Sequence, residues 1–496
     1  MPQQMLNWIG LQLPKEFALI LPQVQLGIFA LGILLTDFLL DRKSRWWNAV
    51  LALAGVGFSA SALWKLRNVE DVSAYHSSII VDPFAVFFGF LFLISAALVI
   101  LLSVRYLDIE EEHHGEFYAL LLLATIGMMF LASGIDLITL FLGLETMALS
   151  FYILSGFLRS RKASNEGAVK YLLLGAFSSG ILVYGFSLMY GIAGSTNLAR
   201  IAQAYATRPP GDPLVLVSLV TVSAGLFFKI AAVPFHMWAP DVYEGAPTSI
   251  TASISVASKA ASFALLLRIF CTAFWPIKPS WEMVVAGVAV ASMTIGNFGA
   301  ITQNNLKRLL AYSSIGHVGY MLLGLVAGNQ DGFKGIAFYL LVYVFMNTGA
   351  FAIVILLRRE GVIGEDIEDL NGLISRRPVA AILLLIFMLS LAGIPPTAGF
   401  IGKYFIFLSL IETGHYVLAV FAALYIAPAL YYYFRVVVHA WMKEPAGAAR
   451  PVISFAQGVA LAACTLFILV AGLLPEQFIK FAGTTLQSQF LQMILR

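Results

Sequence analysis

The chain has 496 residues, of which 60% are hydrophobic and only 11% are charged. Because a water-soluble fold carries about 25% charged residues, this composition excludes most soluble enzymes and predicts an all-α polytopic membrane protein. The net charge of +3 is spread along the chain, without the basic cluster that binds nucleic acid.

Sequence motifs for cofactor binding are missing from the chain. The two cysteines, Cys271 and Cys464, each stand alone in an apolar stretch, which argues against a haem, iron–sulfur or zinc site. No GxGxxG motif opens a strand–helix unit, so no nucleotide site is expected either. Any redox chemistry connected with this chain is therefore expected in partner proteins.

Hydrophobic segments long enough to cross a bilayer recur along the whole chain. A spanning helix needs about 20 mostly apolar residues, and about 14 segments meet this criterion. The first follows an amino terminus without the basic n-region of a signal peptide, so it is expected to stay in the mature protein. The predicted spans lie near 16–40, 47–66, 79–104, 117–133, 136–158, 166–194, 213–242, 247–274, 281–302, 308–327, 333–358, 378–413, 416–442 and 451–474.

The connections between these spans differ in charge. Lysine and arginine are more frequent in the first, third, fifth, ninth, eleventh and thirteenth connections than on the opposite side, which includes both termini. Since cytoplasmic loops carry the excess of basic residues, both termini are predicted on the outer, periplasmic side of a bacterial inner membrane.

Prolines interrupt the seventh and twelfth predicted spans. Pro234 falls inside the seventh, and Pro395 with Pro396 falls inside the twelfth, so both spans are predicted to be broken helices. A broken backbone exposes polar groups, which inside a membrane need a cavity lined by protein or water.

The two broken spans also carry a short internal similarity. Ala224–Lys229 resembles Ala398–Lys403, because each segment places lysine five residues after alanine. The copies are five spans apart and would face opposite ways, an arrangement typical of inverted repeats in transporters, whose sites lie near the bilayer midplane.

Four charged side chains fall inside apolar runs, namely Glu145, Lys229, Lys259 and Lys403. A charge at the bilayer centre costs roughly 2.5–3.5 kcal/mol on insertion scales, and such residues usually mark ion or proton pathways. We therefore interpret them as a proton relay in which Glu145 pairs with a lysine. The structural alternatives are a permanent ion pair and, for Lys259 and Lys403, a side chain that reaches the membrane interface.

Two histidines are further candidates for the relay. His236 and His317 could pass protons between lysines, because histidine exchanges protons near neutral pH. The structural alternative for each is a packing histidine with satisfied hydrogen bonds.

Other polar residues favour structural roles. Lys307 and Arg308 begin the tenth span and are expected in a solvated loop or at lipid headgroups. Asp82 and Arg268 lie near span ends, where a structural pair or a helix cap is expected. The tyrosine cluster 431–433 is expected in packing or in an interfacial belt.

One segment carries a family signature. The run Pro234–Thr248, PFHMWAPDVYEGAPT, resembles the antiporter-like membrane subunits of respiratory complex I. Leu306–His317 (LKRLLAYSSIGH) and Leu391–Pro396 (LAGIPP) support this resemblance, which covers essentially the whole chain. Among the three related types, Met237–Gly245 and the lysine at position Lys403 resemble type N rather than type L or M.

The resemblance implies a fold and a site. It implies about 14 spans, ten of them in two inverted five-helix repeats, which would be 117–274 and 281–442 here. It also implies that Glu145, Lys229, Lys259 and Lys403 line proton half-channels. NADH, FMN, iron–sulfur clusters and quinone are then expected in partner subunits of the same membrane arm.

The expected function is that of a proton-translocating membrane subunit of NADH:quinone oxidoreductase. Quinone reduction elsewhere in the complex would drive protons through the Glu/Lys relay. The main alternative is a subunit of a multi-subunit cation/proton antiporter, and a weaker one is a purely structural membrane subunit.

Overall fold

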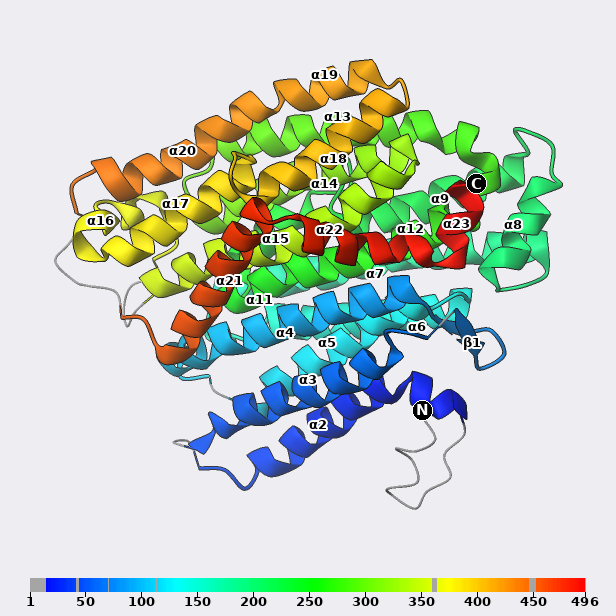
Figure 1. Ribbon diagram of the computed structural model, residues 1–496. Coiled ribbons are helices and arrows are strands. Elements are labelled where there is room, and N and C mark those ends of the chain that lie inside the picture. Colours follow the sequence, from blue (N-terminus) through cyan, green and yellow to red (C-terminus); the bar gives the residue numbers. More distant parts are fainter. Residues whose placement is uncertain are drawn as a thin grey trace.

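A computed structural model describes residues 15–41, 44–69, 71–112, 114–358, 364–445 and 452–495, and most of them are helical. Figure 1 shows the long helices lying side by side along one main direction. The α-helices are α2 (Leu21–Asp37), α3 (Trp47–Leu66), α4 (Pro83–Glu110), α5 (Gly115–Ser133), α6 (Leu137–Ser155), α7 (Lys162–Ala193), α8 (Leu198–Ala206), α9 (Pro213–Ile230), α10 (Trp238–Gly245), α11 (Thr248–Ser253), α12 (Lys259–Phe270), α13 (Lys278–Ile301), α14 (Leu306–Ala327), α15 (Gln330–Leu357), α16 (Leu373–Arg376), α17 (Pro378–Ala392), α18 (Ala398–Glu412), α19 (Tyr416–Leu424), α20 (Ile426–Met442), α21 (Phe455–Leu473), α22 (Glu476–Gly483) and α23 (Gln489–Leu495).

Shorter elements connect or interrupt these helices. One hairpin, β1 (Val72–Ala74) with β2 (Ile79–Val81), precedes α4 and is antiparallel. The remaining helical turns are η1 (Lys15–Leu19), the π-turn η3 (Ile254–Ser258), η4 (Trp275–Ile277), η5 (Ile367–Leu370) and η6 (Thr484–Gln487).

The described residues contain 12 helical segments that are long and apolar enough to cross a membrane. Two shorter apolar helices, α2 and α17, fall outside this group because they have 17 and 15 residues. The structure therefore shows the multi-pass helical architecture expected from the composition. Both spans predicted to be broken are interrupted in the structure, since α9 and α10 replace the seventh and α17 and α18 the twelfth.

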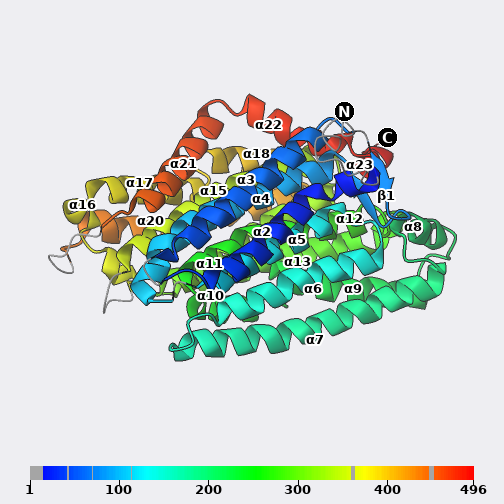
Figure 2. The ribbon, with the colours of Figure 1, turned by 90° about the horizontal axis from the view of Figure 1, so that it is seen from below.

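Burial divides the bundle into a centre and a periphery. The most apolar stretches of Thr248–Phe270 and of Gln330–Leu357 are buried throughout. In α7 and in the segment Tyr416–Met442, by contrast, more than half of the most apolar stretch is not buried. Figure 2 shows α7 running along one edge of the bundle, while α19 and α20 lie at an edge in Figure 1. Apolar side chains exposed on such helices face lipid or neighbouring chains in a membrane, where no hydrophobic penalty applies. Of the four charged residues singled out above, Lys259 lies in one of these central segments, whereas Glu145, Lys229 and Lys403 lie on α6, α9 and α18.

Candidate functional site

The first helix break positions Lys229. Helix α9 ends at Ile230, and Ala231 takes a left-handed conformation with φ 58° that closes the helix. Proline at position 234 cannot donate the hydrogen bond that a continuing helix needs. The Nε1 of Trp238, at the start of α10, donates to the carbonyl oxygen of Phe228 at 2.9 Å and ties the two half-helices together.

Hydroxyl groups, not a carboxylate, contact the Lys229 ammonium. Its Nζ lies 3.1 Å from Ser179 Oγ of α7 and 3.4 Å from Tyr152 Oη of α6. The side chain is buried, with 7% of the residue exposed, so it does not reach the membrane interface. Lys229 also lies in the last turn of α9, where the helix dipole favours a cation.

Aromatic packing fixes the position of Tyr152. Its ring meets Tyr171 edge to face with centroids 4.7 Å apart, and Tyr171 stacks on Trp238 at 4.6 Å. In α7, Gly175 faces the Tyr152 hydroxyl so closely that an added Cβ would lie 2.0 Å from it. The hydroxyl that contacts Lys229 is therefore positioned by residues of α7 and α10.

Glu145 lies near Lys229 without pairing with it. Among the described residues, no ion pair within 4.0 Å joins the two, although the charge of Glu145 acts on the lysine. Glu145 precedes Tyr152 by seven residues, about two turns, and so lies on the same side of α6. Its Oε1 is buried without a hydrogen-bond partner among the described residues. The expected carboxylate neighbour of Lys229 is thus present, but with a polar atom left unsatisfied.

Lys259 follows a locally widened helix. The π-turn Ile254–Ser258 directly precedes α12, and π-turns inside α-helices are frequent at functional sites. The Lys259 ammonium donates to Ser314 Oγ at 2.7 Å and to the Ser314 carbonyl oxygen at 3.2 Å. Only 2% of the residue is exposed, which removes the alternative of a side chain reaching the interface.

His317 is buried and contacts two tyrosines from other helices. Its Nδ1 is 2.6 Å from Tyr339 Oη and its Nε2 is 2.9 Å from Tyr433 Oη. The charges of both Lys259 and Lys403 are close enough to act on its ring. Tyr433, assigned to packing or an interfacial belt from the sequence, is instead a polar contact of this histidine.

The second break positions Lys403. Helix α17 ends before Gly393, whose φ of 80° suits glycine, and α18 begins after Pro395 and Pro396. The Lys403 ammonium donates to the carbonyl oxygens of Ala392 at 2.8 Å and Leu391 at 3.3 Å. The last carbonyl groups of a helix have no partner within it, so Lys403 caps α17 from the following half-helix.

The two similar hexapeptides do not occupy equivalent places at the two breaks. Lys229 precedes its break, in α9, whereas Lys403 follows its break, in α18. A different correspondence links Ala231 and Gly393, the residues of left-handed conformation that follow α9 and α17. Pro234 comes three positions after Ala231, and Pro396 comes three positions after Gly393. Each of these prolines is preceded by a cis peptide bond.

His236 is not joined to either half of the relay by a hydrogen bond. It lies in the first break, and its Nδ1 is buried without a hydrogen-bond partner among the described residues. Among the described residues, His317 is hydrogen-bonded to two buried tyrosines, and no hydrogen bond joins either histidine to Lys229, Lys259 or Lys403.

The prediction of a solvated Lys307 is wrong. Its side chain is buried, donates to the Ala246 carbonyl oxygen at 2.9 Å and pairs with Glu365 at 3.1 Å. Glu365 lies far from Lys307 in sequence, and no local pattern announces the pair. The neighbouring Arg308 is partly exposed and pairs with Asp241 and Glu244 of α10, both at 2.8 Å.

The structural role predicted for Asp82 and Arg268 is confirmed. Arg268 binds both carboxylate oxygens of Asp82 at 2.7 and 2.8 Å, and both side chains are 1% exposed. Asp82 also caps α4 by accepting from the backbone N–H of Ala85 at 2.8 Å. The guanidinium lies against the rings of both Phe84 and Phe490, with centroids 4.6 and 4.5 Å away, and the two rings also contact each other edge to face.

Sequence analysis missed the polar residues that surround the charges, above all Tyr152, Ser179, Ser314 and Tyr339. Helical spacing from Glu145 could have pointed to Tyr152, whereas the others come from different helices. Among the described residues, no group of three or more His, Cys, Asp or Glu side chains could hold a metal ion.

Comparisons with known proteins agree on one family. The family model of the NADH:quinone oxidoreductase/Mrp antiporter transmembrane region matches residues 133–427, more than half of the chain. A protein of Solibacter usitatus (strain Ellin6076), NADH-quinone oxidoreductase subunit N 2, is 54% identical over 477 residues, or 94% of this chain and 97% of that protein.

Solved structures show the same fold. A chain of respiratory complex I from Thermus thermophilus with bound aureothin has a TM-score of 0.79 and 31% identity, covering 93% of this chain and 99% of that one. A chain of the Mrp complex from Dietzia sp. DQ12-45-1b has a TM-score of 0.80 over 96% of this chain and 99% of that one, but at 22% identity it shows the fold alone.

Proposed function

Since the chain belongs to the NADH:quinone oxidoreductase/Mrp antiporter family, as a membrane subunit of type N, we propose that its buried lysines carry protons across the membrane. The chain is a proton-translocating membrane subunit of NADH-quinone oxidoreductase, and its partners are other subunits of that complex. NADH, FMN, iron–sulfur clusters and quinone belong to those partner subunits under this proposal.

The relay has two groups of residues. In the first, Glu145 and the two hydroxyls of Tyr152 and Ser179 surround Lys229. In the second, we place His317 between Lys259 and Lys403, which is supported by the action of both lysine charges on its ring. Lys403 is the terminal carrier of the relay and delivers protons toward the outer side.

The observation that carries the proposal is the unpaired state of Glu145 beside the buried Lys229. Removing a lysine from water disfavours its charged form, while a carboxylate close by favours it. Movement of Glu145 toward Lys229 therefore promotes proton uptake, and movement away promotes release to Lys259. A permanent ion pair could not switch in this way.

Redox energy must supply the drive. Each elementary charge moved against the membrane potential costs about 2.3 kcal/mol per 100 mV. We assign the trigger to quinone reduction in a neighbouring subunit, which changes the charge at one end of the polar axis and thereby moves Glu145.

The membrane arrangement under this proposal has about 14 spans. The 12 candidates become 14 when α2 is added and the two halves α17 and α18 are joined into one broken span. The repeats 117–274 and 281–442 are supported by the similar closure of their breaks, where a left-handed residue precedes proline by three positions. The excess of basic residues in alternate connections supports outer termini in a bacterial inner membrane.

The variant Lys229→Ala tests the relay in the assembled complex. We expect NADH-driven proton uptake by inverted membrane vesicles to fall steeply, because the first group loses its only ammonium. Lys480→Ala is the matched control, since the Lys480 side chain is 73% exposed and lies on α22. An unchanged ratio of protons to electrons together with an unchanged oxidoreductase rate in Lys229→Ala would exclude the relay.

Blue-native electrophoresis of the same membranes separates the remaining alternatives. The chain should migrate with NADH dehydrogenase activity in a band of complex I size. Migration only at antiporter size, without that activity, would favour a multi-subunit cation/proton antiporter. Normal assembly and normal pumping in Lys229→Ala would favour a purely structural subunit.

A further inference from the structure

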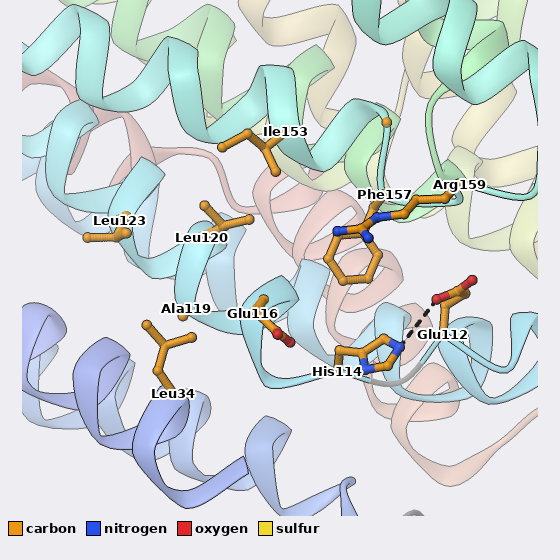
Figure 3. Close-up of a pocket in the computed structure, with 11 residues that line it drawn as sticks. Leu34, Glu112, His114, Glu116, Ala119, Leu120, Leu123, Ile153, Phe157 and Arg159 are labelled. Carbon is orange, nitrogen blue, oxygen red and sulfur yellow. Dashed lines mark ion pairs between the residues drawn. The ribbon is translucent and has the colours of Figure 1, made fainter. Parts of the chain in front are cut away.

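A groove of about 510 Å³ lies away from the relay, between α2, α5 and α6. This volume falls in the range of about 300–1,000 Å³ that is usual for ligand sites. Figure 3 shows its apolar end, lined by Leu34, Leu120, Leu123 and Ile153. A ligand with hydrocarbon chains can therefore bury them against three helices.

The opposite end of the groove carries charges of both signs. Figure 3 places Arg159, Glu112 and His114 at that end, with Glu116 between them and the leucines. Two of these groups are already engaged, because His114 lies 3.3 Å from Glu112 and accepts or donates at 2.9 Å with Arg45. Phe157 packs against the His114 ring, with centroids 6.3 Å apart.

The remaining two charges, Arg159 and Glu116, are exposed and have no side-chain partner among the described residues. One is a cation and the other an anion, so together they add no net charge to the groove. A guanidinium binds phosphate through paired N–H donors, and a carboxylate, which is acceptor-only, binds the N–H groups of an ammonium. The pair thus matches a single zwitterion better than an anion.

We propose that this groove binds one phospholipid with a primary-amine headgroup of the phosphatidylethanolamine type. Its phosphate binds Arg159, its ammonium binds Glu116, and its acyl chains lie along Leu120, Leu123 and Ile153. The site is amphipathic in the same sense as the lipid, with charges at one end and hydrocarbon at the other. A choline headgroup does not satisfy it, because its trimethylated nitrogen has no N–H group to offer Glu116.

The test uses the whole purified complex and a phosphatidylethanolamine with a photoreactive group in one acyl chain. We expect the probe to label α5 and α6 near Leu120 and Ile153. Unlabelled phosphatidylethanolamine should compete several-fold better than phosphatidylcholine. Equal competition by the two lipids, or labelling elsewhere only, would overturn the proposal.

Variants separate the two headgroup contacts. Arg159→Gln should reduce labelling about tenfold, which is the size of one charge-assisted hydrogen bond. Glu116→Gln should abolish the preference for phosphatidylethanolamine over phosphatidylcholine while leaving both lipids able to bind. The matched control Arg105→Gln removes another exposed arginine, on α4, and should change neither result.

A neighbouring protein segment is the competing occupant. A photoreactive amino acid replacing Leu123 should therefore give an adduct of lipid mass. Crosslinking to another subunit in place of lipid, in a complex that still assembles, would refute the lipid site. Unchanged labelling in Arg159→Gln would refute it as well.

Discussion

Removal of the hydroxyl groups around Lys229 is the sharpest test of how that lysine is held. Tyr152→Phe and Ser179→Ala each delete one polar partner of the ammonium and leave the ring or the Cβ in place. Both hydroxyls hold the lysine in the arrangement without a carboxylate contact. Losing one should shift Lys229 toward Glu145 and slow proton release.

The size of the effect follows from the contact lengths. A hydrogen bond to a charged group contributes about 1.5–3 kcal/mol, and the Tyr152 contact at 3.4 Å is long enough to take the lower end of that range. About 1.4 kcal/mol corresponds to a tenfold change in an equilibrium, so Tyr152→Phe should slow pumping by up to about tenfold. Ser179, at 3.1 Å, should have an effect at least as large.

The two changes should not be independent, because both act on one ammonium. Once either hydroxyl is absent, Glu145 takes over part of its role as a polar partner of the ammonium. Removal of the second hydroxyl should then slow pumping by a smaller factor. The double variant should therefore pump clearly faster than the product of the two single effects predicts. Distant sites add within about 0.3–0.5 kcal/mol, so a deviation beyond that limit is measurable.

The assay is NADH-driven proton uptake by inverted vesicles, normalised to the amount of assembled complex. Tyr205→Phe is the control, since the Tyr205 hydroxyl is also buried but contacts Ser218 at 2.5 Å, away from Lys229. It should lower thermal stability and leave pumping per complex unchanged. The reasoning would be refuted if the effects of Tyr152→Phe and Ser179→Ala on the pumping rate were strictly additive in free energy. It would also be refuted if these variants pumped at the unchanged rate expected of Tyr205→Phe.

Three further outcomes follow from the contacts. Arg268→Met should destabilise the complex by about 3–5 kcal/mol, because Asp82 then stays buried without its partner; thermal unfolding measures the loss, and stability equal to that of the parent would contradict it. Gly399→Ala should prevent stable assembly, since a Cβ there meets the Ser390 carbonyl oxygen at 1.9 Å, whereas Gly180→Ala, which faces open space, should assemble normally on native gels. His317→Phe should leave the complex assembled and abolish proton uptake, while quinone reduction continues in uncoupled vesicles. Full pumping by this variant would exclude His317 from the proton route.

The sequence was informative wherever the physics is local. Hydrophobic length identified the spanning segments, and proline identified both broken spans, because a missing N–H acts on its own helix. The cost of a buried charge singled out Lys229, Lys259 and Lys403, and all three are buried in the structure.

The environment of those charges could not be predicted, because it is built from several helices. Tyr433 reaches His317 across 116 positions, and Lys307 reaches Glu365 across 58. A basic residue at the start of a span resembles a loop residue in sequence, and only helix packing distinguishes a buried Lys307 from a solvated one. The short similarity around Lys403 misled for the same reason, since a hexapeptide does not record which side of a break it occupies.

The contact between Lys403 and the end of α17 has a consequence for its chemistry. An ammonium has three N–H donors, and the neutral amine that remains after deprotonation still has two. The two carbonyl oxygens of Leu391 and Ala392 need two donors. The end of α17 can thus stay capped in either protonation state of Lys403, and the lone pair of the neutral amine then points away from the two carbonyl oxygens. A change in the charge of Lys403 therefore does not require the end of α17 to lose its capping hydrogen bonds.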